Sequence, residues 1–252
     1  MIKKSLIFLF LIILIISSFG QSVQLTSKHK DKLYPDKKIV SRYHNDWTQG
    51  HYPKRIMEFK NDPLEFGDIV FIGNSITEKG GNWSERFETM HVRNRGISGD
   101  VTDGVLKRLD EIVYFKPKAV FILIGINDLF SLHNEEDGRN LKYDKVVPST
   151  KYIGKRILKI TKVIHRKSPE TRVFVQTVLP TRTDYLKEDI LLVNDMIKKN
   201  EIKGYYKVID IYDRFVDADG LLTKELTVDG IHLSDKGYEK WVSVETPVVE
   251  DL

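Results

Sequence analysis

The amino-acid sequence predicts an α/β protein in which helices cover both faces of a parallel central sheet. Uninterrupted apolar runs of strand length alternate along the chain with segments whose apolar residues recur at helical spacing. The runs end at glycine or proline, which is typical of strands that are buried on both faces. Regular alternation of such strands with amphipathic helices indicates one domain built on a parallel sheet.

Five strands are predicted in chain order. The first apolar run is closed by Gly73 and the third by Gly125, whereas Pro180 follows the fourth. The second and fifth strands are short, and their bounds are the least defined. The predicted strands are Asp68–Ile72, a short strand near Val92, Ala119–Ile124, Arg172–Val178 and Val208–Ile211.

The segments between the strands carry apolar residues three or four positions apart, which predicts amphipathic helices. Residues 101–115 place four aliphatic side chains on one helical face, and Pro117 stops this helix. Near the C-terminus, Ser234 caps a final helix that carries Tyr238 and Trp241. The other predicted helices span Tyr152–His165 and Ile190–Lys199.

Residues 1–20 have the form of a secretory signal peptide. Lys3 and Lys4 precede an unbroken apolar run from Leu6 to Ile16, and small residues lead up to Gly20. The run is shorter than the roughly 20 residues that a membrane-spanning helix needs, which disfavours an uncleaved anchor. The sequence therefore predicts cleavage after Gly20, export to the periplasm or the medium, and no stable membrane insertion afterwards.

Residues 21–63 are polar and aromatic, and we interpret them as an N-terminal extension that precedes a single domain over residues 64–252. One or two short helices are expected in the extension. The last of them should start near Pro53, because proline suits the first turn of a helix.

Composition excludes several classes of protein. The 252 residues are 41% hydrophobic and 30% charged, as in an ordinary globular protein. The net charge of +4, or +2 without Lys3 and Lys4, is too balanced for a dedicated nucleic-acid binder. The chain has no cysteine, so disulfides, thiolate zinc sites and thiol catalysis are impossible. The basic helix between Lys151 and Lys167 is most simply a solvated face.

Polar clusters follow the ends of three predicted strands, and a fourth cluster lies near the C-terminus. Ligand sites of parallel sheets lie at the carboxyl ends of the strands, so we expect these clusters to converge. The clusters are Gly73–Thr77, Arg95–Asp100, Gly125–Asp128 and Asp229–His232.

Ser75 is a candidate nucleophile, since a serine at a strand-to-helix turn exposes its hydroxyl at the sheet edge. His232 is a candidate base, and Asp229 lies close enough in sequence to fold back onto its other ring nitrogen. The competing interpretations are that Ser75 only caps a helix and that His232 is an ordinary surface histidine.

Acyl transfer also requires hydrogen-bond donors for the negative charge that develops on the carbonyl oxygen. Gly99 allows a backbone N–H to approach closely, Asn127 offers a side-chain amide, and the N–H of Ser75 is a third donor. The alternative is that these are only turn residues, since glycine and asparagine favour turns.

Taken in order, Gly-Asn-Ser-Ile-Thr, Gly-Ile-Ser-Gly-Asp, Gly-Ile-Asn-Asp and Asp-Gly-Ile-His resemble the four blocks of the SGNH (GDSL-type) hydrolase family. The resemblance covers residues 67–241 and implies a flavodoxin-like three-layer α/β/α sandwich with a central parallel sheet of about five strands. It also implies a catalytic triad of Ser75, Asp229 and His232, with Ser75, Gly99 and Asn127 as the oxyanion hole. Asn74 stands where the family name implies aspartate, and we expect activity to survive this departure.

The resemblance implies a serine esterase that needs neither metal nor organic cofactor. The sequence is similar to bacterial carbohydrate and sialate O-acetylesterases and to the platelet-activating-factor acetylhydrolase-like branch. The polar loop 131–143 beside Asn127 has few large apolar residues, which favours short acyl groups on glycans. A small-molecule or glycan ester is thus the expected partner. A lipid esterase, either a lysophospholipase or of the acetylhydrolase-like kind, and a catalytically silent glycan-binding module are the alternatives.

Overall fold

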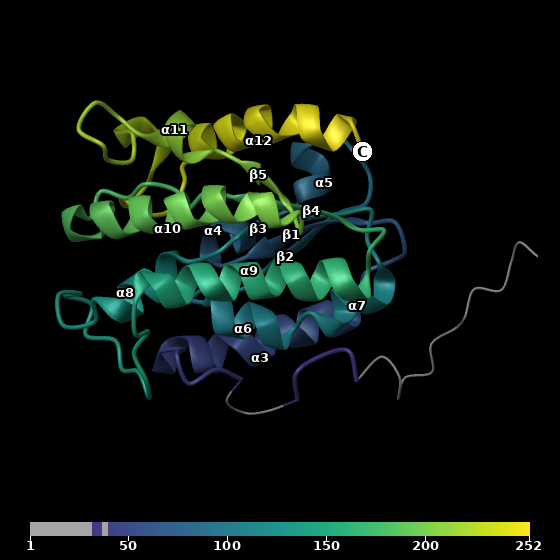
Figure 1. Ribbon diagram of the computed structural model, residues 1–252, viewed down its shortest axis with the longest axis horizontal. Coiled ribbons are helices and arrows are strands. Elements are labelled where there is room, and N and C mark those ends of the chain that lie inside the picture. Colours follow the sequence, from purple (N-terminus) through teal and green to yellow (C-terminus); the bar gives the residue numbers. More distant parts are fainter. Residues whose placement is uncertain (1–31, 37–39) are drawn as a thin grey trace, which may run out of the picture. The chain divides into compact units, whose positions relative to one another are not determined.

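The computed structural model describes residues 32–36 and 40–252, and residues 33–252 form one compact unit (Figure 1). The predicted signal peptide, residues 1–20, lies outside the described residues. No helix within the described ranges is both long and apolar enough to cross a bilayer.

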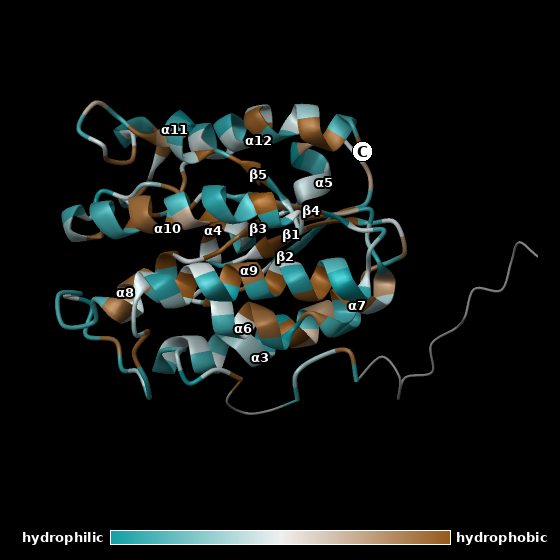
Figure 2. Ribbon diagram, in the orientation of Figure 1, coloured by the Kyte–Doolittle hydropathy of each residue, from teal (hydrophilic) through white to brown (hydrophobic). Residues whose placement is uncertain are grey.

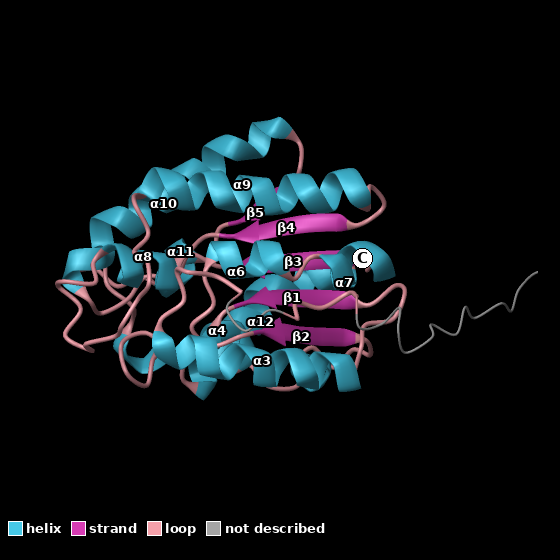
Figure 3. Cartoon of the chain, turned by 90° about the horizontal axis from the view of Figure 1, so that it is seen from below, coloured by secondary structure: helices cyan, strands magenta, loops and turns pink. Residues whose placement is uncertain are grey.

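The central sheet has five parallel strands in the order β2-β1-β3-β4-β5, which confirms the predicted α/β class (Figure 3). In register, Ile69 of β1 lies opposite Val92 of β2 and Ala119 of β3. The strands are β1 (Ile69–Gly73), β2 (Val92–Gly96), β3 (Ala119–Leu123), β4 (Arg172–Gln176) and β5 (Lys207–Ile209).

One face of the sheet packs against helices α4, α5, α11 and α12 through an aromatic core. Phe71 of β1 stacks on Trp83 at 4.7 Å and on Phe121 of β3 at 4.6 Å between ring centroids. Trp241, predicted on the last helix, meets Trp83 edge to face. These helices are α4 (Ser75–Glu78), α5 (Trp83–Arg86), α11 (Tyr212–Phe215) and α12 (Asp235–Glu250).

The helices that follow β2, β3 and β4 form the third layer (Figure 1). The predicted apolar stripe of α9, from Ile153 to Ile164, is fully buried, and its hydrophilic turns alternate with hydrophobic ones in Figure 2. The layer comprises α6 (Thr102–Lys107), α7 (Asp110–Phe115), α8 (Ile126–Leu132), α9 (Thr150–Lys167) and α10 (Lys187–Asn200).

The single helix predicted over residues 101–115 is wrong, since the chain forms two helices, α6 and α7. The backbone turns at Arg108, whose side chain points into the protein. Its guanidinium donates to the carbonyl oxygens of Arg95 and Gly73 and to the Asp100 carboxylate. A buried arginine needs several acceptors, and the turn lets Arg108 reach them.

The helix expected to start near Pro53 begins earlier. Helix α3 runs from Asp46 to Asn61, with Pro53 in its interior, because Asn45 caps it by accepting a hydrogen bond from the N–H of Thr48. Proline removes one intrahelical hydrogen bond, and the buried face of α3 offsets that loss. Helix α3 lies beside β2, the edge strand (Figure 3), where Phe59 packs with Ile97.

Candidate active site

Ser75 is the first residue of α4, and only Asn74 separates it from the end of β1. Gly73, the last residue of β1, has to be glycine, because a Cβ there would overlap the carbonyl oxygen of Leu123. Asn74 then caps α4, its side-chain oxygen accepting from the N–H of Ile76 at 3.0 Å. Tyr238 of α12 fixes the same helix by donating to the carbonyl of Ile76. The Ser75 side chain is thereby held at the carboxyl edge of the sheet.

The structure brings Ser75 and His232 together across 157 positions of sequence. The Ser75 hydroxyl lies 2.9 Å from Nε2 of His232, and Nδ1 of His232 lies 2.6 Å from Oδ2 of Asp229. The other oxygen of Asp229 accepts from the backbone N–H groups of Ile231 and His232. The loop between the two residues is closed by Gly230, whose positive φ of 86° suits glycine. The carboxylate is thus fixed by the same turn that presents the imidazole.

The electrostatics of the acid-histidine pair define which ring nitrogen carries the proton. Burial raises the pKa of Asp229, but hydrogen bonds from the His232 ring and from two backbone N–H groups outweigh burial and lower the pKa below its usual value. The carboxylate is therefore ionised at neutral pH and can only accept. It follows that Nδ1 of His232 is protonated and that Nε2 is the acceptor for the Ser75 hydroxyl.

Gly99 lies in the loop after β2, at the same pocket as Ser75. Its φ is +81°, and a Cβ at this position would lie 1.9 Å from Oγ1 of Thr48 in α3. Both conditions require glycine. Neither the N–H of Gly99 nor that of Ser75 donates to a protein acceptor within the described residues. Both donors are therefore available to a bound ligand.

Asn127 completes the predicted set of donors at the start of α8. Its side-chain amide donates to the carbonyl oxygen of Asp100 at 3.0 Å, which leaves the second amide hydrogen for a ligand. The neighbouring Asp128 is buried and accepts from the hydroxyl and the N–H of Thr102. Burial raises the pKa of Asp128 to about 7, although these hydrogen bonds oppose the shift. Asp128 thereby ties α8 to α6 behind the pocket.

Glu78 was missed by the sequence analysis, although it lies one helical turn after Ser75. Its carboxylate accepts from the N–H of Ser98, the residue before Gly99, and from Nε2 of His51 in α3. Burial raises the pKa of Glu78, but the hydrogen bonds from His51 and Ser98 outweigh it and leave the pKa lowered. The spacing from Ser75 was the only sequence signal for this residue.

A buried ionic cluster supports the other side of the Gly99 loop. The carboxylate of Asp100 lies 2.8 Å from Nε2 of His44 and 2.9 Å from Nε of Arg108, and all three side chains are buried. His44 belongs to the predicted N-terminal extension. Nothing in the local sequence indicates this contact, because the partners lie 56 positions apart.

These residues surround a cavity of about 320 Å³ whose lining contains Ser75, Gly99, Asn127 and His232. Its outer wall comes from two segments that meet at a bridge between Asn45 and Tyr143. Trp47 of α3, 56% exposed, stands at the wall and stacks on His51 at 4.8 Å. The predicted extension therefore contributes to the pocket. The remaining wall residues are Lys79, Ser98, Phe130, Arg139, Leu141 and Ile231.

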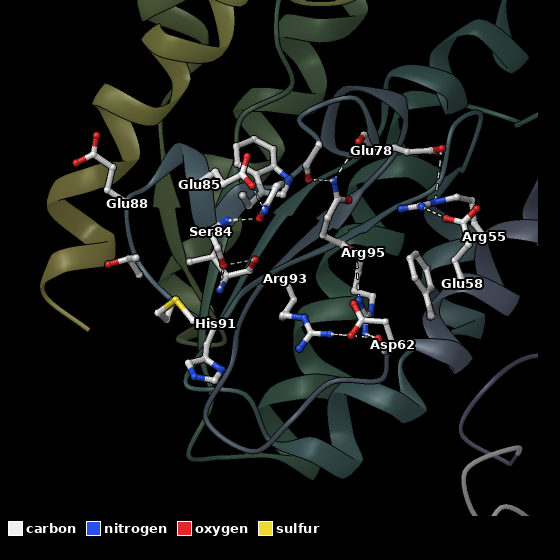
Figure 4. Close-up of a pocket in the computed structure, with 18 residues that line it drawn as sticks. Arg55, Glu58, Asp62, Glu78, Ser84, Glu85, Glu88, His91, Arg93 and Arg95 are labelled. Atoms are coloured by element: carbon white, nitrogen blue, oxygen red, sulfur yellow. Dashed lines mark hydrogen bonds and ion pairs between the residues drawn. The ribbon is translucent and has the colours of Figure 1, made fainter.

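A larger cavity of about 860 Å³ follows the outer edge of β2 (Figure 4). Its cations are neutralised by protein carboxylates, Arg55 by Glu58 and Arg93 by Asp62. The hydroxyl of its Ser84 is engaged with the backbone of Val92. This cavity has no serine-histidine contact, so the smaller one is the candidate active site. No group of three or more His, Asp or Glu side chains in the described ranges is arranged to hold a metal ion.

The fold and the four assembled blocks define a hydrolase of the SGNH type. Residues 71–240 match the model of the GDSL-like lipase/acylhydrolase family. The chain belongs to this family and is a carboxylic ester hydrolase.

The relatives agree with this assignment. The chain is 28% identical over 181 residues to platelet-activating factor acetylhydrolase IB subunit alpha2 of Rattus norvegicus, covering 69% of this chain and 72% of the relative. A GDSL-like lipase from Bacteroides thetaiotaomicron has a TM-score of 0.65 at 21% identity, over 79% of this chain and 97% of that structure. A mutant acetylxylan esterase from Geobacillus stearothermophilus has a TM-score of 0.58 at 17% identity, covering 72% and 93%. These two structural likenesses establish the fold.

Proposed function

We propose that this protein is an exported serine esterase that removes short acyl groups, chiefly acetyl, from oxygen atoms of carbohydrates. The observation that carries the proposal is the continuous contact from Ser75 through His232 to Asp229, in which Ser75 and His232 line the cavity. A hydroxyl alone is a weak nucleophile, and a neutral imidazole at 2.9 Å can accept its proton.

In the proposed mechanism, Oγ of Ser75 attacks the ester carbonyl while its proton passes to Nε2 of His232. The negative charge on the carbonyl oxygen is met by the N–H groups of Ser75 and Gly99 and by the Asn127 amide. The C–O bond to the alcohol then breaks, and His232 returns the proton to the leaving oxygen. Water, deprotonated by His232, attacks the acyl-serine, and His232 then returns this proton to Oγ of Ser75 as the carboxylic acid is released. Asp229 stabilises the imidazolium in both halves of the reaction.

The size and lining of the cavity support a short acyl group. Its volume of about 320 Å³ lies at the lower end of the range of ligand sites, roughly 300–1,000 Å³. The relatives named above as acetylhydrolases of platelet-activating factor also favour acetyl. The exposed indole of Trp47 at the wall is a flat surface of the kind on which sugar rings stack. A lipid acetyl ester is the second candidate, since Phe130, Leu141 and Ile231 line the same cavity.

Replacement of the proposed nucleophile tests the mechanism. Ser75→Ala should abolish hydrolysis of 4-nitrophenyl acetate and labelling by a fluorophosphonate probe, because only an activated serine reacts with that probe. Ser84→Ala, which removes a hydroxyl at the other cavity, is the matched control and should still be labelled. Labelling of Ser75→Ala at the wild-type rate would contradict the proposal, and an unlabelled wild type would favour a non-catalytic binding module.

Acyl length tests the substrate class. We expect kcat/KM for 4-nitrophenyl esters to be highest at two carbons and to fall as the chain lengthens, because the cavity is small. A maximum at eight or more carbons would favour the lipid alternative. Acetate release from acetylated xylan, compared with release from an acetylated lipid, then separates carbohydrate from lipid acetyl esters.

Export rests on the residues before Gln21 alone. N-terminal sequencing of the protein recovered outside the cytoplasm should begin at Gln21, after cleavage behind Gly20. An intact N-terminus in a membrane fraction would show instead that the apolar segment is retained as an anchor.

A further inference from the structure

Helix α9 carries an unbalanced charge. Between Thr150 and Lys167 it contains seven lysine and arginine residues and no aspartate or glutamate. The complete chain is nearly balanced, with 40 basic and 36 acidic residues. The other long helices mix both signs, as in α10, where Glu188 and Asp189 accompany Lys198 and Lys199. The charge of α9 is therefore a local feature and does not follow from composition.

Five of these cations form one line on the surface of the helix. At 3.6 residues per turn they occupy a sector of about 80°, opposite the buried isoleucines, and they extend over about 22 Å. The line begins at the active-site edge of the sheet, where α9 starts, and runs toward the opposite edge. We call it the α9 stripe, and it consists of Lys151, Lys155, Lys159, Lys162 and Arg166.

None of the stripe cations makes a hydrogen bond or ion pair with another residue of the described ranges. Arg156, which points away from the stripe, is by contrast paired with Asp103. Leu158 and Val163 of the same helix flank the stripe. An exposed line of uncompensated cations is suited to a negatively charged chain.

We propose that the α9 stripe binds a linear acidic polysaccharide, with carboxylates along the polymer meeting successive cations. The successive stripe positions are about 4.5–6 Å apart along the helix, a spacing at which a chain with one acidic group per sugar can make several contacts together. This binding is separate from the hydrolytic site and does not depend on it. The enzyme would thereby be held on an anionic glycan while its pocket acts on nearby esters.

An anionic bilayer fits the stripe less well. Helices that lie on membranes combine basic residues with large apolar side chains that insert between the lipids. None of the large exposed hydrophobic residues of the described chain lies on α9, and its isoleucine face is buried against the core. A single line of charge along one helix matches a polymer strand better than a flat membrane surface.

Binding can be measured directly with polygalacturonate, which carries carboxylates and no acyl ester. We expect Ser75→Ala and the wild type to bind it equally, to bind neutral xylan weakly, and to lose the polymer as salt rises. The variant K155Q/K159Q/R166Q changes three exposed stripe residues and should bind at least about tenfold more weakly. The matched control K54Q/K203Q/K240Q removes three exposed lysines elsewhere and should change affinity less than about twofold.

Three results would overturn the proposal. They are absence of polymer binding at low salt, equal weakening by both triple variants at unchanged thermal midpoints, and binding to phosphatidylglycerol vesicles without binding to polygalacturonate. Because Ser75→Ala is inactive in the proposed mechanism, polymer binding and esterase activity can fail independently of each other.

Discussion

Among single residues, Gly99 has the most restricted position in the site. Its backbone is in the left-handed region and its missing side chain makes room for Thr48 of α3. The hydroxyl of Thr48 is buried and has no hydrogen-bond partner, so Thr48 meets Gly99 only by packing. One glycine thus couples the proposed oxyanion loop to the N-terminal helix.

The variant Gly99→Ala should lower the free energy of unfolding by roughly 2–4 kcal/mol, from left-handed strain and from overlap with Thr48. It should also lower kcat for 4-nitrophenyl acetate, because the N–H of residue 99 moves. In a Thr48→Ala background the overlap is reduced while the strain remains, so the same change should cost about 1–2 kcal/mol less. Urea denaturation of the four proteins measures the coupling, and strictly additive effects would contradict it.

The lowered pKa of Asp229 excludes this carboxylate as the cause of activity loss near neutral pH. Its pKa is lowered, so the carboxylate that orients His232 persists below the ordinary value for aspartate. We expect Asp229→Asn to reduce kcat by several orders of magnitude, because an amide can hold the ring in the wrong tautomer. The pH profile of kcat/KM checks that Asp229 stays ionised. If wild-type activity falls on the acidic side with a midpoint at or above pH 6, that midpoint belongs to another group and should persist in Asp229→Asn. Its disappearance in Asp229→Asn would contradict the lowered pKa of Asp229.

At the level of secondary structure, the loop 97–100 is held by elements from both sides. Helix α4 supplies Glu78, which accepts from the N–H of Ser98, and α3 packs against Gly99. Trp47 and His51, one turn apart on α3, connect the pocket wall to the same carboxylate. Glu78 is therefore a positioning residue for the donors, and it does not line the candidate active-site cavity.

Removal of that carboxylate should affect turnover more than binding. Glu78→Ala should lower kcat about tenfold or more with little change in KM, because the donors matter chiefly in the transition state. Glu78→Gln retains an acceptor and should recover part of the loss.

Since the pKa of Glu78 is lowered, its contribution to stability is present above its ordinary pKa of 4.5 and is lost as pH falls through the lower folded value. Thermal midpoints measured between pH 3 and pH 7 should show this acidic loss in wild type and a smaller one in Glu78→Gln.

Across the complete fold, one core residue links stability to pH. Glu245 of α12 is fully buried, and neither carboxyl oxygen has a hydrogen-bond partner. Burial raises its pKa to about 8, and Trp241, one turn earlier, opposes the shift only in part. The folded protein therefore keeps Glu245 protonated at neutral pH, whereas the unfolded chain releases the proton.

This difference predicts that the contribution of Glu245 to stability is greatest below pH 4.5, where both states hold the proton, and declines as pH rises to about 8. The slope contributed by Glu245 is at most about 1.4 kcal/mol per pH unit. Glu245→Gln should remove it, so the difference in unfolding free energy between variant and wild type should grow from pH 5 to pH 8. Glu239→Gln, an exposed change on the same helix, should leave the slope unaltered. Parallel curves for Glu245→Gln and wild type would refute the assignment.

Much of the fold could be predicted because its signals are local. The apolar runs at Ile69 and Ala119 form strands, and the isoleucines at helical spacing form the buried face of α9. The errors came where a distant partner decides the backbone. Arg108 bends the chain between α6 and α7 to reach carbonyl groups on other elements, and Asn45 starts α3 ahead of Pro53.

By itself, the sequence determined the strand-helix order, the family and five site residues, because those depend on patterns within short segments. Four of the five line one pocket, and Asp229 contacts it through His232. The tertiary structure decided which distant groups support them. Glu78 accepts a hydrogen bond from the N–H of Ser98, and Trp47 lines the pocket. The side chains of His44 and Arg108 contact the Asp100 carboxylate. Such contacts arise only when packing brings remote segments within a few ångströms. Hydrogen bonds and ion pairs act over that short range, so no local pattern in the chain encodes them.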